Sequence, residues 1–240
     1  MKRTVKNKLV KYACVGISLL LAVFFIARFG APSILRLYVE VGIGTCQKIP
    51  ALCIVPTEDI TDPDINTGYV SGLLPYSFPK MDISVPRGFA VNLERITKVY
   101  YKKRHKGRGA IIYLLSEGPD FFIKLFPPMK KQGIKDDYEF IKRVAYADLH
   151  NIKNLTDAFF VIMKSIFTPD MGNQKDLKIA QLTMPHKRGF LSYTLSASGN
   201  YFNCDLIDDK GYFFKIYIRD TTAALDRDKV LAMISTIERP

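Results

Sequence analysis

The sequence predicts an α+β fold in which an antiparallel sheet packs against helices, as in an α/β/α sandwich, with an N-terminal transmembrane helix before it. The transmembrane helix is predicted from residues 12–27, which carry no charge. The sheet is predicted from residues 178–220, where apolar and polar side chains alternate in successive blocks. The helices are predicted from apolar side chains at helical spacing in residues 136–167 and 226–237. Strands and helices in separate blocks along the chain are typical of the α+β class.

The chain has 240 residues, of which 48% are hydrophobic, so it can bury a core and full disorder is excluded. Its net charge is +12, from 35 Lys and Arg residues against 23 Asp and Glu residues. Residues 1–28 contribute +6 and residues 102–108 contribute +5, which leaves +1 for everything else. Outside these two basic segments the chain is therefore nearly neutral.

Residues 1–28 read as a basic segment followed by a transmembrane signal anchor. The run YACVGISLLLAVFFIA at 12–27 covers about 24 Å as a helix. Snorkelling of Lys11 and Arg28 brings it to the thickness of a bilayer core. Residues 19–22 pass around the helix without a strongly polar side chain, which favours a lipid-exposed helix over a buried core helix.

A cleavable signal peptide is the alternative, but Ala31 and Ser33 are the only small residues with suitable spacing after the run, so an uncleaved anchor is favoured. Five basic residues precede the run, whereas Arg28, Arg36 and Lys48 are spread out after it. The positive-inside rule then predicts a cytoplasmic N-terminus and an extracytoplasmic C-terminal domain, which would be periplasmic in a bacterium. The sequence therefore predicts a single-pass protein of the cell membrane.

Residues 29–82 are expected to be a juxtamembrane segment. Arg36 and Glu40 are spaced for an ion pair on a short interfacial helix. Cys46 and Cys53, in CQKIPALC, are predicted to form a disulfide in an oxidising compartment, with two free thiols as the alternative. Their spacing fits neither a redox CxxC motif nor a zinc site. Residues 57–82 show no sustained period and read as a linker or an extended wrap.

Residues 83–240 are expected to form the α+β domain. A hairpin has its tip at 102–108, and its second strand, AIIYLL, is apolar on both faces and therefore central. A further strand is expected in DFFIKLFPP at 120–128, and a helix follows from Asp136 or Asp137. A second helix is expected to be capped by Thr156. The chain then forms a four-stranded meander with Cys204 in its core, and a closing helix begins near Asp226.

The last strand of the meander, YFFKIYI at 212–218, has a regular alternation. Phe214, Ile216 and Ile218 lie on one face, and Lys215 and Arg219 lie on the other. This pattern predicts a sheet that is covered on one side.

Two stretches carry a resemblance to a known family. The segment ISVPRGF at 83–89 resembles the opening of PsbP-like domains, and GYFFKIYIRD followed by KVLAMISTIE is similar to their closing strand and helix. The resemblance covers about residues 83–240. It implies an α/β/α sandwich with a binding or accessory role, and it supplies no catalytic residue.

Catalytic motifs are missing from the sequence. His105, His150 and His186 are not spaced as metal ligands, and no nucleophile elbow, Walker A loop or dinucleotide fingerprint is present. The segment DPDINTG at 62–68 alternates like a calcium loop, but Thr67 stands where the loop needs Gly, so an Asp/Asn turn is favoured. We therefore expect no enzyme activity, no cofactor and no metal.

The second basic segment is a candidate contact surface. It consists of Lys102, Lys103, Arg104, Lys106 and Arg108. A solvated hairpin tip, a contact with anionic lipid or an acidic protein surface, and a contact with nucleic acid are the three interpretations. Nucleic acid is disfavoured by the predicted compartment, and the membrane is the expected partner.

The leading functional hypothesis is a membrane-anchored extracytoplasmic domain with a non-catalytic binding or accessory role. A membrane-tethered hydrolase whose site forms only in the fold is one alternative, and it requires a deep pocket with two carboxylates, or with a carboxylate and His150 or His186. A structural component of an envelope complex is the other, and it requires Phe159, Phe160 and Phe167 to be exposed.

Overall fold

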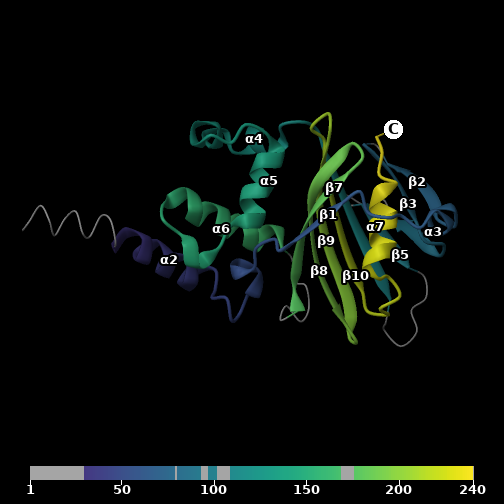
Figure 1. The fold of residues 1–240 in the computed structure, drawn as a ribbon, viewed down its shortest axis with the longest axis horizontal. Coiled ribbons are helices and arrows are strands. Elements are labelled where there is room, and N and C mark those ends of the chain that lie inside the picture. Colours follow the sequence, from purple (N-terminus) through teal and green to yellow (C-terminus); the bar gives the residue numbers. More distant parts are fainter. Residues whose placement is uncertain (1–29, 79, 93–96, 102–108, 169–175, 240) are drawn as a thin grey trace, which may run out of the picture.

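The computed structural model describes residues 30–239, apart from residue 79 and the ranges 93–96, 102–108 and 169–175. In this part of the chain, eight strands form one sheet that lies between a layer of helices and a layer formed by one helix and a hairpin (Figure 1). In spatial order the strands are β1 (Glu58–Thr61), β7 (Lys178–Met184), β8 (Lys187–Ser196), β9 (Gly199–Asp208), β10 (Phe213–Asp220), β6 (Ala110–Glu117), β5 (Thr97–Tyr101) and β4 (Phe89–Asn92).

Strands β7 to β10 form the antiparallel meander that the sequence predicts. Cys204 in β9 lies opposite Leu191 in β8 and Ile216 in β10. Strand β6 pairs with both β10 and β5, so the predicted central strand does lie inside the sheet. Strand β1 pairs in parallel with β7, with Glu58 opposite Ala180, so the sheet is mixed rather than wholly antiparallel. The parallel edge strand comes from a segment that the sequence predicts to be a linker.

Both faces of the sheet are covered. On one face Phe202, Cys204 and Leu206 are fully buried beneath α7 (Arg227–Ser235) and a separate hairpin of β2 (Leu74–Phe78) and β3 (Met81–Val85). On the opposite face Phe190 and Phe213 pack against the helical layer. The prediction that residues 212–218 are covered on one side is therefore only partly right. The helical layer buries Phe213 on the second face, whereas Lys215 and Tyr217 on that face are half-buried.

The helical layer is built around two longer helices. Helix α5 (Asp137–Tyr146) begins at the predicted cap, since Asp136 accepts the N–H of Glu139 at 2.7 Å. Helix α6 is capped by Asn154, which accepts the N–H of Asp157 at 2.9 Å, and not by Thr156. The elements of this layer are α2 (Ala31–Gly42), η2 (Pro50–Cys53), α4 (Phe121–Leu125), η3 (Pro127–Gln132), α5 (Asp137–Tyr146), η4 (Leu149–Asn151) and α6 (Leu155–Phe167).

Residues 120–128 form α4 and the start of η3, and the prediction of a strand there is wrong. The carboxylate of Asp137 accepts the N–H groups of Phe122 at 2.9 Å and Ile123 at 3.2 Å, which satisfies the first turn of the helix. The ring of Phe122 stacks on that of Phe140, with 4.7 Å between the ring centroids. Contacts with the following helix, rather than the local propensity of residues 120–128, therefore make this segment helical.

The described residues of 57–82 are part of the domain, so the structure rejects the linker and agrees better with the alternative of a segment that wraps around the domain. They contain β1, α3 (Thr67–Ser71), β2 and the start of β3. Asn66 accepts the N–H of Tyr69 at 2.9 Å, so the turn that resembles a calcium loop serves as the cap of α3. Leu73 and Phe78 are buried in the main core. The fold therefore begins well before residue 83, because these residues, like α2 and η2 before them, pack into the domain.

The closing helix agrees with its prediction. Asp226 caps α7 by accepting the N–H of Lys229 at 2.9 Å, and Val230, Met233 and Ile234 are fully buried. The predicted transmembrane run at 12–27 lies outside the described residues. From residue 30 onward, the described helices include none with both the length and the apolar character needed to cross a bilayer.

Candidate functional site

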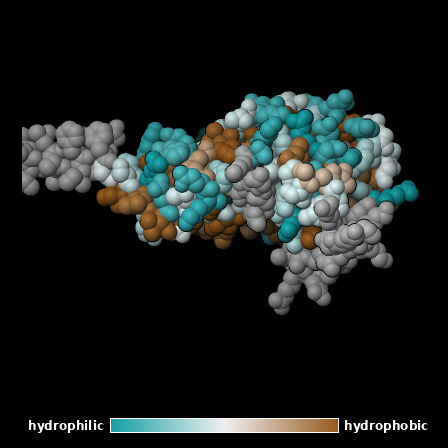
Figure 2. Space-filling view, turned by 90° about the horizontal axis from the view of Figure 1, so that it is seen from below, coloured by the Kyte–Doolittle hydropathy of each residue, from teal (hydrophilic) through white to brown (hydrophobic). Residues whose placement is uncertain are grey.

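Helix α2 presents an apolar stripe to solvent, at the opposite end of the molecule from α7 (Figure 1). Ile34, Leu37, Tyr38 and Val41 are 64%, 59%, 74% and 81% exposed. Their spacing places them on one side of the helix, and we call this stripe the α2 face. Figure 2 shows hydrophobic side chains gathered over this end of the molecule. Four exposed apolar residues in one stripe mark a contact surface, whereas single ones are ordinary.

The other side of α2 holds the helix to the domain. Val39 is 1% exposed and packs in a cluster with Leu52 and Leu149. Arg36 and Glu40 form the predicted ion pair, with 2.8 Å between Nε and Oε1. The helix is thus fixed along one side and exposes apolar side chains along the other.

A disulfide closes the turn that follows α2. The structure joins Cys46 to Cys53, as the sequence predicts, with 5.8 Å between their Cα atoms. Pro50 begins the short helix η2, which ends at Cys53, so the loop between the two cysteines contains a 3₁₀ turn. Ala51 and Leu52 on this turn are fully buried. The disulfide therefore lies where α2 joins the helical layer.

His150 lies against this disulfide, although 104 residues separate it from Cys46. Its Nε2 atom is 3.5 Å from the Sγ atom of Cys46. Asp148 accepts the backbone N–H of His150 at 2.9 Å and caps η4, which fixes the position of the histidine. Ligand atoms of Cys46, Cys53 and His150 all lie within 4.8 Å of one another.

Loss of the disulfide is expected to lower the free energy of unfolding. The bridge joins residues seven apart, and closing so short a loop contributes about 2.4 kcal/mol through the entropy of the unfolded chain. We expect the Cys53→Ser variant to lose about this amount in urea unfolding of the full chain in detergent with a metal chelator present. Reduction of the wild type should give the same loss. Unchanged stability after complete reduction would contradict the prediction.

A charged groove runs along α5. Its volume is about 470 Å³, and it is open to solvent. The guanidinium of Arg188 lies 3.9 Å from the ring centre of Tyr138 and 4.0 Å from the carboxylate of Asp136. The groove suits a polar ligand or a partner surface of mixed charge. The charged and aromatic side chains that line it are Asp136, Tyr138, Glu139, Lys142, Arg143, Tyr146 and Arg188.

Lys164 is a buried lysine inside α6. It is 1% exposed, and its ammonium donates to the carbonyl oxygens of Ile54 at 2.6 Å, Ala145 at 2.8 Å and Ala147 at 2.6 Å. Burial lowers the pKa of Lys164 to about 7, while the charge of Asp148 acts in the opposite direction. The side chain thus joins three chain segments at the centre of the helical layer.

A small polar cavity lies between this layer and the sheet. Its volume is about 20 Å³, and Lys164, Asn203 and Asp205 are among the residues that line it. Asp205 forms an ion pair with Lys215, with 2.8 Å between Oδ1 and Nζ, and Lys215 also donates to the carbonyl of Phe167 at 3.1 Å. The cavity is the size of one water molecule, so it is too small for a substrate.

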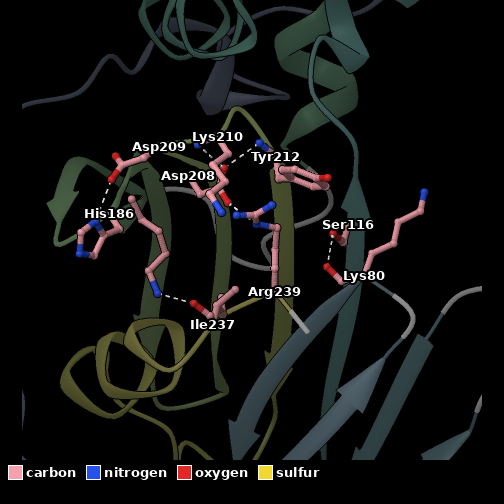
Figure 3. A network of polar contacts seen from close by, with 10 residues as sticks. Lys80, Ser116, His186, Asp208, Asp209, Lys210, Tyr212, Ile237 and Arg239 are labelled. Carbon is pink, nitrogen blue, oxygen red and sulfur yellow. Dashed lines mark hydrogen bonds and ion pairs between the residues drawn. The ribbon is translucent and has the colours of Figure 1, made fainter.

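His186 pairs with Asp209, with 2.8 Å between Nδ1 and Oδ2 (Figure 3). The two side chains are 86% and 67% exposed, and neither lines the groove or the cavity. Beside them, Asp208 pairs with Arg239 at 2.9 Å, and Lys187 donates to the carbonyl of Ser235 at 2.9 Å. The polar network in Figure 3 therefore fastens the C-terminal residues to the sheet.

The structure describes some of the predicted site residues and not others. It brings Cys46 and Cys53 together, whereas Lys102, Lys103, Arg104, Lys106 and Arg108 lie outside the described residues. Sequence reasoning missed Lys164, although a single charge in the apolar run AFFVIMKSIF was a visible signal. It also missed the position of His150, for which the sequence has no signal, because the contact depends on how η4 packs against η2.

Comparisons with protein-family models and with curated proteins give no match for this chain. The resemblance to PsbP-like domains therefore stays a prediction that rests on residues 83–89 and 211–238.

Proposed function

We propose that the chain is a single-pass membrane protein with a cytoplasmic N-terminus. Its α+β domain lies on the extracytoplasmic side, rests on the bilayer through the α2 face, and has a non-catalytic binding or accessory role. The α2 face carries this proposal, because it begins a few residues after the uncharged run at 12–27.

The chemistry of the α2 face suits the interface of a bilayer. Transfer of a Leu, Ile or Val side chain from water to an apolar environment is favourable by about 1.5–3 kcal/mol when burial is complete. Tyr38 adds a ring with a polar end, the kind of side chain that gathers at membrane interfaces. A helix that lies flat on lipid with one apolar side is a stable arrangement.

The shape of the domain supports binding over hydrolysis. A deep pocket with two carboxylates would favour a hydrolase. The cavity between the helices and the sheet has only about 20 Å³, and the α5 groove, which Asp136 and Glu139 line, is open to solvent rather than deep. His150 and His186 are exposed and line neither the groove nor that cavity. Phe160 is buried and Phe159 and Phe167 pack beside it, so the exposed aromatic surface required for an envelope scaffold is not found in α6. The α5 groove is the surface on which we place a polar ligand or partner.

The predicted topology can be tested with reporters fused after Pro240. We expect a phosphatase reporter, which folds only outside the cytoplasm, to be active, and a fluorescent reporter that folds only inside the cytoplasm to be dark. Activity of the cytoplasmic reporter alone would overturn the proposal.

Contact of the α2 face with lipid can be measured in proteoliposomes. An environment-sensitive fluorophore on Val41→Cys is expected to shift to the blue and to be quenched by brominated lipid. The matched control is Lys210→Cys, at an exposed turn on the sheet. Equal quenching at the two positions would count against a bilayer contact through α2.

A further inference from the structure

We propose that Cys46, Cys53 and His150 form a metal site when the disulfide is reduced, and that the ion it takes is Zn²⁺. The site rests on the geometry of these three side chains and not on the proposed membrane role. Because it needs the reduced cysteines, it forms in the proposed extracytoplasmic domain only when a reductant reaches the disulfide.

The distances between the donor atoms fit such a site. With Zn–S bonds of about 2.3 Å and Zn–N bonds of about 2.0–2.1 Å, a sulfur and a nitrogen of one tetrahedral site lie about 3.6 Å apart. The Sγ atom of Cys46 and the Nε2 atom of His150 are 3.5 Å apart. The Sγ atom of Cys53 belongs to the same group, in which all donor atoms lie within 4.8 Å of one another.

The donor types select the metal. Two thiolates and one imidazole make a borderline-soft set that suits Zn²⁺ and excludes Ca²⁺ and Mg²⁺, which require oxygen ligands. His150 is exposed and both cysteines are partly exposed, so the ion can enter and a water molecule can take the fourth position. A three-ligand site with one open position is an established zinc arrangement.

The surrounding fold holds the donors in place. Cys53 ends η2 and His150 lies in η4, and the fully buried neighbours Leu52 and Leu149 pack these two turns together. Asp148 fixes the backbone of His150. Because the third donor lies 104 residues after Cys46, the spacing in CQKIPALC alone predicts no zinc site.

Oxidation and metal binding exclude each other at this site. A dithiol reductant transfers two electrons and two protons to the disulfide and becomes a disulfide itself, which leaves Cys46 and Cys53 as thiols. Binding of Zn²⁺ then releases both thiol protons to solvent, and the two sulfurs separate to about 3.8 Å around the ion. The oxidised chain has no thiolate to offer, so the site is open only in the reduced protein.

The test uses the full chain in detergent with Cys14→Ser, which removes the thiol of the apolar run. After reduction with a phosphine and removal of the reductant under anaerobic conditions, Zn²⁺ is titrated against a chromogenic chelator. We expect one Zn²⁺ per reduced chain and none per oxidised chain. Co²⁺ in place of Zn²⁺ should give the visible absorption of a tetrahedral thiolate complex.

Variants separate a built site from incidental binding. His150→Ala is expected to weaken Zn²⁺ affinity at least tenfold. Loss of a residue that only holds a metal ligand in place already lowers metal affinity by roughly 10- to 100-fold, and His150 would be a ligand itself. His186→Ala removes an exposed histidine elsewhere and should leave the affinity unchanged. Zn²⁺ should also slow alkylation of Cys46 and Cys53 in the reduced chain and not in His150→Ala.

Three results would overturn the proposal. They are equal Zn²⁺ binding by the oxidised and reduced chains, equal affinity of His150→Ala and His186→Ala, and the absence of stoichiometric binding by the reduced chain. The side chain of His150 is exposed, so its variant keeps the fold, which far-ultraviolet circular dichroism verifies.

Discussion

Replacement of Lys164 with alanine is expected to lower the free energy of unfolding by about 3 kcal/mol or more. The change leaves the buried carbonyls of Ile54, Ala145 and Ala147 without their donor, and each unsatisfied buried acceptor costs about 1–3 kcal/mol. A cavity in the helical layer adds to the loss, and relief from burying a charge offsets part of it.

Urea unfolding of the full chain in detergent, followed by circular dichroism, measures this effect. The control is Lys142→Ala, on the exposed side of α5, which should change the free energy of unfolding by less than about 0.5 kcal/mol. Similar losses in the two variants would show that the three contacts of Lys164 contribute nothing specific.

The same residue sets a dependence on pH. Burial lowers the pKa of Lys164 from 10.5 to about 7, so between these values the unfolded chain binds more protons than the folded chain. The free energy of unfolding contributed by this group therefore rises with pH across that window. We expect the wild type to gain stability relative to Lys164→Met between pH 7 and pH 10, measured as the difference between their urea transitions. A constant or falling difference would contradict the lowered pKa.

Replacement of Gly189 with alanine is expected to destabilise the sheet by about 3 kcal/mol or more, at the upper end of overpacking effects. A Cβ atom at this position in β8 would lie on top of the carbonyl oxygen of Asp205 and only 2.9 Å from the Cα atom of Leu206. Both contacts are with the backbone of the neighbouring strand, so a change of rotamer cannot relieve them. Strands β8 and β9 would have to move apart in the middle of the sheet.

Thermal unfolding of Gly189→Ala beside Gly118→Ala tests this prediction. A Cβ atom on Gly118 would meet no atom within 4 Å, so that variant controls for the loss of glycine flexibility alone. We expect a large fall in melting temperature for Gly189→Ala and little change for Gly118→Ala. Equal melting temperatures would mean that the two strands are not packed as closely as the structure places them.

The elements that the sequence predicts correctly are those with strong local signals. The meander from β7 to β10 shows period-2 alternation, and α5 and α7 combine a 3.6-residue period with capping by Asp136 and Asp226. These signals lie within one element and its immediate flanks, so they need no knowledge of the fold.

The elements that the sequence predicts wrongly depend on distant partners. Strand β1 has only four residues and pairs with β7. Two side-chain contacts add to this pairing: Glu58 forms an ion pair with Arg227 at 2.8 Å and accepts a hydrogen bond from the hydroxyl of Tyr193 at 2.9 Å. Both partners lie more than a hundred residues away. Helix α4 likewise needs Asp137 for its first turn. A short segment without its partners has no period to reveal it.

By itself, the sequence predicted the α+β class, the meander and the starts of α5 and α7, and it favoured a disulfide of Cys46 with Cys53 over two free thiols, because each of these depends on neighbouring residues or on redox chemistry. The tertiary structure alone decided that α2 exposes its apolar face, that Lys164 donates to three carbonyls, and that His150 lies beside the cysteines. The physical reason is that burial and coordination depend on packing between segments far apart in the chain, which no local pattern records.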